Sequence, residues 1–160
     1  MEDLEDQPLG YLLYRVVAAL RAEVVATVLQ PRGLSFPGYL CLRLLSQAPG
    51  SSNAQLARVT GVSPQAMNKV LRDLQQSGLV ARPATAPAGR SLPASLTPEG
   101  ARTLSRMEPE IAESERRVLA GLTEQGRREL RRLLATAAAT HPDTGASADG
   151  TGPIPGAFRP

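Results

Sequence analysis

The chain has 160 residues, of which 42% are hydrophobic and 21% are charged, and its formal net charge is +3. This size and composition predict one domain, or one domain with an extension, around a hydrophobic core. Because the chain has one cysteine, it cannot form an internal disulfide framework. The acidic N-terminal segment lacks the basic and apolar regions of a signal peptide. No apolar run reaches the roughly 18 residues needed to span a bilayer. We therefore expect a soluble, cytoplasmic protein.

The first predicted element is a long helix over residues 8–30. Its apolar residues recur at the i, i+3 and i+4 spacing of an amphipathic helix, and they are Leu9, Leu12, Leu13, Val16, Val17, Leu20, Val24 and Val28. Pro31 and Gly33 end the pattern. A stripe of this length needs a partner surface, which is either the chain's own later helices or a second subunit.

A second helix is predicted over residues 36–47, where Ser35 is suited to cap the start and the dipeptide Pro49-Gly50 closes the end. The residues expected to point inward are Leu40, Leu44 and Leu45.

Residues 52–78 are predicted to form two short helices joined by a tight turn. Ser52 and Gln55 have the spacing of a capping box at the first helix, and Gly61 marks the turn because glycine accepts left-handed backbone angles. Ser63 caps the second helix, and Pro64 occupies its first turn, where a missing N–H costs nothing. One apolar stripe follows, made of Met67, Val70, Leu71 and Leu74, before Gly78 ends the helix.

The opposite face of the second short helix is polar and basic. It carries Gln65, Asn68, Lys69, Arg72 and Gln76, with Asp73 as its only acid. Between residues 53 and 90 the basic residues are Arg58, Lys69, Arg72, Arg82 and Arg90, whereas residues 1–30 are mainly acidic. A local positive excess on a helix-turn-helix pattern predicts DNA binding. The alternative is an ordinary solvated helix face.

A β-hairpin, or wing, is predicted next. Residues 79–82 form a short strand, the loop is rich in Pro, Ala and Gly, and a second strand lies near residues 91–96, where Pro93 allows only an edge strand. Thr97, Pro98 and Glu99 then start a helix to about residue 121, with an expected kink at Pro109. Its apolar side is Leu104, Met107, Ile111, Val118 and Leu122.

Thr123 caps a final predicted helix that ends near residue 139. Its inward side is expected to consist of Leu130, Leu133, Leu134 and Ala137, with its arginines mostly outward. Residues 141–160 have the composition of a disordered tail.

This order of elements resembles the MarR family of winged helix-turn-helix transcriptional regulators over about residues 8–140. The frame LA…TGVS…V…L…GLV and the S-L-T-x-x-G that ends the wing support the resemblance. It implies a homodimer joined through the N-terminal and last two helices, a palindromic operator, and a small-molecule pocket between the dimerisation and DNA-binding parts. The family's wing usually has an Asp two residues before an Arg; here Arg90 matches the Arg, but Ala88 occupies the Asp position.

We accordingly expect a mainly α fold, with a winged helix-turn-helix core and a helical dimerisation region. The expected parts are an N-terminal dimerisation helix (1–34), the DNA-binding domain (35–97), the C-terminal dimerisation helices (98–140) and the tail (141–160). In the expected complex with double-stranded DNA, Gln65, Asn68 and Lys69 read bases, while Ser63, Arg72 and Arg90 contact the backbone or minor groove.

An effector site is expected where the few aromatic residues gather in the first two helices. Tyr11, Tyr14, Arg15 and Tyr39 would suit a small aromatic or organic acid, and ordinary core and interface packing is the alternative. No catalytic set, metal site or cofactor is expected. Two rival functions stay open: a redox switch through Cys41, which we interpret as an inert buried thiol, and a winged-helix module that binds protein.

Overall fold

The computed structural model describes residues 4–84 and 92–140. A short 3-10 turn, η1 (Leu4–Asp6), precedes α1 (Leu9–Val24), which continues into η2 (Val25–Leu29) and η3 (Gln30–Arg32). The chain then forms α2 (Phe36–Gln47), α3 (Asn53–Thr60), α4 (Pro64–Gln76), β1 (Val80–Ala81), β2 (Ser95–Leu96), α5 (Pro98–Val118) and α6 (Glu124–Ala139). The mainly α architecture with a two-stranded wing is therefore confirmed.

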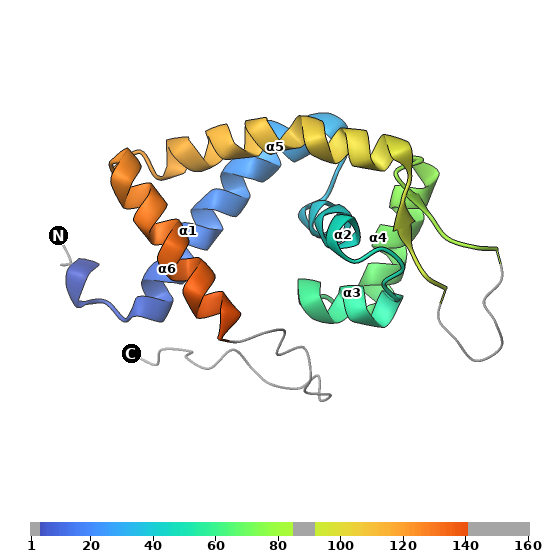
Figure 1. Cartoon of the computed structure of the whole chain (residues 1–160), viewed down its shortest axis with the longest axis horizontal. Helices are drawn as coiled ribbons and strands as arrows, with labels where there is room; N and C mark the ends of the chain where they lie inside the picture. The colour runs from blue at the N-terminus through green and yellow to red at the C-terminus, as the bar shows by residue number, and fades with distance from the viewer. Residues whose placement is uncertain (1–3, 85–91, 141–160) are drawn as a thin grey trace.

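Helix α5 runs along the whole molecule (Figure 1). At one end it lies near α2, α4 and the wing, and at the other end the chain turns back through α6. The helix continues through Pro109 as one element, a gentle arch rather than two segments, and ends at Val118, three residues before the predicted end.

The first helix changes its winding before it stops. After Val24 the backbone forms a π-helical turn, η2, and then the 3-10 turn η3, and Gly33 ends the run at φ 65°. A π turn is rare and occurs mostly as a single-turn bulge within an α-helix. Here the hydroxyl of Thr27 lies 3.0 Å from that of buried Ser114 on α5, and it also donates to the Glu23 carbonyl at 2.8 Å.

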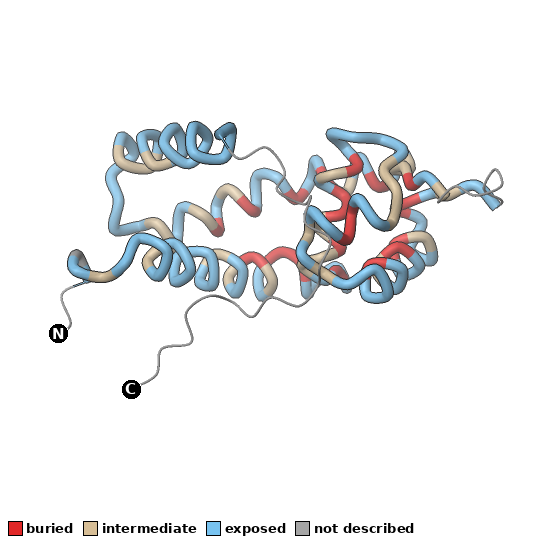
Figure 2. The backbone as a smooth tube through the Cα atoms, turned by 90° about the horizontal axis from the view of Figure 1, so that it is seen from below, coloured by how far each residue is buried: buried red, intermediate tan, exposed pale blue. Residues whose placement is uncertain are grey.

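The hydrophobic core lies in the half of the molecule that holds α2, α3, α4 and the wing (Figure 2). Its largest fully buried side chains are Leu29, Leu42, Leu45, Leu56, Met67, Leu71 and Met107. The other half, made of the N-terminal part of α1 and α6, is mostly exposed. The prediction that one side of α6 packs inward is wrong within one chain. Leu133 and Leu134 are 51% and 45% exposed, and Ala137 is also exposed. Of the four predicted residues, only Leu130 is half-buried. On α5, Leu104, Met107 and Ile111 are buried as predicted, but Val118 is half-buried and Leu122, beyond the helix end, is exposed.

Ion pairs join α5 to the elements beside it. Arg32 of η3 meets Glu110 at 2.5 Å, Arg43 of α2 meets Glu108 at 3.0 Å, and Arg117 meets Glu23 of α1 at 2.8 Å. Because all three pairs are partly exposed to solvent, each contributes little to stability. Among the helices within 4–84 and 92–140, none combines the length and apolar character needed to cross a lipid bilayer.

Candidate nucleic-acid interface

Helices α3 and α4 form the helix-turn-helix, and each begins at the predicted cap. Ser52 accepts from the Gln55 amide at 3.2 Å while the Gln55 side chain accepts from the Ser52 amide at 2.8 Å, which confirms the capping box. Ser63 accepts from the Ala66 amide at 3.1 Å. Gly61 has φ 70°, in the left-handed region that the turn requires.

Two kinds of contact hold the two helices at a fixed angle. Buried Leu56 and Ala57 of α3 belong to the same core cluster as Met67, Leu71 and Leu74 of α4. In addition, the Asn53 side-chain amide donates to the Pro64 carbonyl at 3.1 Å, so the first residue of α3 is bonded to the first residue of α4. Asn53 is not among the residues predicted from the sequence, because nothing local marks a contact across eleven residues.

The three predicted base-reading residues share one exposed stripe of α4 with Arg72, which is predicted to contact the backbone or minor groove. Gln65, Asn68, Lys69 and Arg72 all face solvent at i, i+3, i+4 and i+7 spacing. The Lys69 ammonium lies 2.8 Å from the Asp73 carboxylate. Asp73 therefore competes with any external anion for the charge of Lys69. Ser63 is exposed at the start of α4, with its oxygen already engaged by the cap. Arg90 and Ala88 lie outside the described residues.

The wing is shorter than predicted. Val80 pairs with Leu96 and Ala81 with Ser95, and an isolated bridge joins Ser51 to Ala94. Pro83 and Pro93, which stand just outside the paired residues, have no N–H to donate, and this limits the ladder. The Arg82 side chain donates to the Gln75 side-chain oxygen at 3.0 Å, so the base of the wing is attached to α4.

The junction between the wing and α5 depends on Thr97 and Gly100. The Thr97 hydroxyl donates to the Gly78 carbonyl at 2.6 Å and accepts from the Gly100 amide at 3.0 Å, while the Thr97 amide donates to the Leu79 carbonyl at 3.0 Å. A Cβ at Gly100 would lie 2.0 Å from the Leu79 oxygen. Only glycine therefore allows the start of α5 to lie against the end of the helix-turn-helix.

The four expected effector residues do not meet within one chain. Tyr11 and Tyr14 are exposed near the start of α1, with the Arg15 guanidinium 6.0 Å from the Tyr11 ring. Tyr39 is half-buried on α2, which packs against η2 at the other end of the first helix. Its ring lies 6.0 Å from that of Phe36, and burial raises the pKa of its hydroxyl.

Cys41 is fully buried in the core beneath these helices. Burial raises the pKa of its thiol to about 12, so the thiol stays protonated at neutral pH and is a poor nucleophile. In the parts of the chain that the structure describes, no three His, Cys, Asp or Glu residues are grouped to hold a metal ion.

A rigid helix-turn-helix, a polar and basic stripe on its second helix and an attached hairpin define a winged helix-turn-helix protein. Residues 32–91 match the family model described as MarR family. The chain is 55% identical over 130 residues to the HTH-type transcriptional repressor Rv2887 of Mycobacterium tuberculosis, covering 81% of this chain and 93% of the relative. This chain belongs to the MarR family of transcriptional regulators.

Solved structures support the same assignment. The M. tuberculosis Rv2887 protein in complex with DNA is 50% identical, with a TM-score of 0.72, covering 82% of this chain and 98% of that one. The structure of the same protein with p-aminosalicylic acid has 52% sequence identity to this chain and a TM-score of 0.71. The match covers 82% of this chain and 98% of that one. A complex of that protein with salicylic acid is similar to this chain to the same degree, at 53% identity and a TM-score of 0.71, covering 83% of this chain and 98% of that one.

Proposed function

We propose that this protein is a homodimeric repressor that binds a palindromic operator through α4 and releases it when a small aromatic acid binds. The observation that carries the proposal is the exposed stripe of Gln65, Asn68, Lys69 and Arg72 on a helix whose angle the core and the Asn53 contact fix. In this proposal residues 35–97 bind DNA in the cytoplasm, and the protein has no enzymatic activity. Arg90 and Ser63 add contacts to the phosphate backbone or minor groove.

The dimer is supported by apolar side chains that one chain leaves uncovered. On α1 these are Leu9, Tyr11, Leu13, Tyr14, Val16 and Val17, and on α6 they are Leu133 and Leu134. Both sets lie in the same half of the molecule, so one contact between two copies can cover them together (Figures 1 and 2). The proposed dimerisation region is thus residues 1–34 with residues 98–140.

The effector class is taken from the similar protein of M. tuberculosis, whose structures contain salicylic acid and p-aminosalicylic acid. Binding of such an acid would stabilise one separation of the two recognition helices. Because half-sites lie about 34–36 Å apart along DNA, a changed separation prevents both helices from entering successive major grooves.

The proposal is tested by selecting bound fragments from the source genome and measuring operator affinity by fluorescence anisotropy. Asn68→Ala and Lys69→Ala should each cost about 1–3 kcal/mol at the selected operator and relax its specificity. A matched control is Arg128→Gln, which removes one exposed charge from α6. Parental affinity in both α4 variants would show that this helix does not lie in the groove, and the absence of any selected fragment would favour a protein-binding module.

A cysteine redox switch is the second candidate, and the burial of Cys41 speaks against it. We expect Cys41→Ser to keep the parent's DNA affinity and its response to peroxide. Peroxide-triggered release that disappears in this variant would reverse that conclusion.

A further inference from the structure

Asp73 is the one acidic residue of α4, a helix whose exposed face otherwise carries amides and cations. Its carboxylate lies 2.8 Å from the ammonium of Lys69, one turn earlier, and the two side chains are 57% and 72% exposed. Arg72, next to Asp73 in the chain, is also exposed but forms no ion pair with the described acids. The two cations of this stripe therefore differ, because one is paired with an acid and the other is not.

Helix stability does not account for an acid at this position. Aspartate is a weak helix former, and Asp73 lies in the last turn of α4, beside the negative end of the helix dipole. A lysine four residues before an acid is also the less favourable order for such a pair. Because the pair is exposed, it contributes little to stability. The helix would be at least as stable with an uncharged side chain here.

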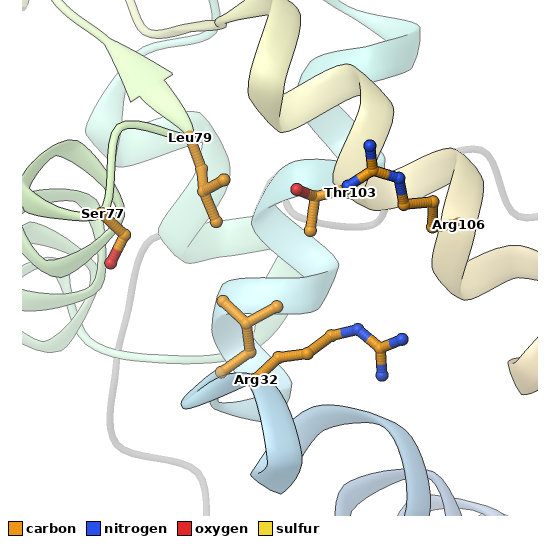
Figure 3. A pocket seen from close by; sticks show the side chains of 6 residues that line it. Arg32, Ser77, Leu79, Thr103 and Arg106 are labelled. Carbon is orange, nitrogen blue, oxygen red and sulfur yellow. The ribbon is translucent and has the colours of Figure 1, made fainter.

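Asp73 does not attach α4 to a neighbouring element either. Among the described residues its carboxylate bonds to Lys69 alone, within the same helix. Figure 3 shows the exit of α4 and a pocket of about 330 Å³ between this exit and α5. The two arginines that line this pocket, Arg32 and Arg106, pair with other acids. The lining consists of Arg32, Leu34, Ser77, Leu79, Thr103 and Arg106.

The ion pair limits what Lys69 can bind. An ammonium group has three donors, and Asp73 occupies one of them while offsetting the positive charge. Two donors remain for uncharged acceptors, and the guanine edge in the major groove presents two such acceptors, N7 and O6. A phosphate, in contrast, has to compete with the carboxylate for the charge of the ammonium. Paired Lys69 is therefore suited to a base edge, whereas unpaired Arg72 is suited to a phosphate.

We propose that Asp73 is a specificity-determining residue, which holds the Lys69 ammonium for a guanine edge and lowers the affinity for unrelated DNA. This rests on the proposed function, since it needs α4 in the major groove, and it adds the residue that sets the ratio of specific to non-specific binding. Sequence-independent affinity comes from cations that contact phosphates. A phosphate contact that Asp73 prevents is lost on unrelated DNA, but not at an operator where Lys69 contacts a base.

The test compares the full chain with its Asp73→Asn variant on two duplexes of equal length and base composition, the selected operator and an unrelated sequence. Anisotropy is measured from about 50 to 200 mM salt. Loss of the acid's repulsion should tighten binding to both duplexes about fivefold at low salt. On unrelated DNA, Lys69 of each subunit also gains a phosphate, so the affinity should rise about fivefold further and the salt slope by about 1 per subunit. The ratio of operator to unrelated affinity should thus fall about fivefold.

Two controls separate this role from other effects of removing a charge. Glu129→Gln removes the same charge from a comparable exposed pair, in which Arg132 lies 2.6 Å away, on α6 at the other end of α5 from α4 (Figure 1). It should leave the ratio and both salt slopes at the parent's values. In the second control, Asp73→Asn is made in a Lys69→Ala background. Because the acid acts through the lysine, the ratio should then not fall.

A parental ratio and a parental salt slope on unrelated DNA in Asp73→Asn would overturn the role of Asp73. An equal fall of the ratio in the Lys69→Ala background would overturn it too, as would weaker operator binding, which would indicate that the carboxylate itself contacts a base. These results leave the repressor intact, because the parent still selects its operator. A parent that binds every fragment equally removes the sequence-specific repressor, and the role of Asp73 with it.

Discussion

Replacing Gly100 by Ala should destabilise the protein, although alanine is the better helix former. The added Cβ would lie 2.0 Å from the Leu79 oxygen and 3.0 Å from the Leu79 carbonyl carbon, and both are backbone atoms that cannot rotate away. To relieve this contact, α5 must move from the end of the helix-turn-helix. That movement breaks the Thr97 hydrogen bonds to the carbonyls of Gly78 and Leu79.

The magnitude follows from three contributions. Overpacking costs about 1–3 kcal/mol, the two lost hydrogen bonds cost about 1 kcal/mol each, and the better helix propensity of alanine returns about 1 kcal/mol. We therefore expect Gly100→Ala to lower the free energy of unfolding by about 2–4 kcal/mol. Urea denaturation followed by circular dichroism, at one fixed protein concentration, measures this difference.

The chain contains a matched control. Gly126 occupies the same third position of α6, and its amide donates to its own cap, Thr123, at 3.1 Å. A Cβ at Gly126 would meet the Thr123 hydroxyl at 3.4 Å and no backbone atom within 4 Å among its three nearest neighbours. Gly126→Ala should thus be neutral or stabilising by up to about 1 kcal/mol. Equal stability of the two variants would refute the argument that α5 and Leu79 are in obligatory contact.

Three further outcomes are expected. Asp73→Asn removes the acid beside Lys69 and should tighten DNA binding by about 1 kcal/mol at low salt, measured by anisotropy across a salt series; weaker binding would contradict this. Ser114→Ala removes a buried hydroxyl that lies 3.0 Å from that of Thr27 and should cost about 1–2 kcal/mol in urea denaturation, whereas Ser105→Ala on the exposed side should cost almost nothing. Burial raises the pKa of the Cys41 thiol from 9.0 to about 12, so the thiol loses its proton at lower pH in the unfolded chain than in the folded one. The free energy of unfolding should therefore fall from about pH 9 upwards. Cys41→Ala should lack that part of the pH dependence.

Local features of this chain were predictable because their causes lie within a few residues. A serine or threonine that accepts an amide three residues later explains the starts of α3, α4, α5 and α6, and the left-handed angle at Gly61 explains the turn. The exposed stripe of α4 also followed from the sequence, since helical periodicity alone separates Gln65, Asn68, Lys69 and Arg72 from the buried stripe. The dimer and the roles of these side chains stay predictions.

Contacts between distant segments were decided only by the tertiary structure. Thr97 and Thr123 each precede a glycine at the third helical position, and the capping pattern by itself does not show which of the two glycines another segment approaches. Only the packed chain brings the Leu79 carbonyl against Gly100 and leaves Gly126 without such a neighbour. In the same way, Arg106 belongs to a pocket because α5 passes the exit from α4, which no spacing along α5 could indicate. Caps and periodicity act over one or two turns, whereas a close approach or a pocket depends on where the whole core places each helix.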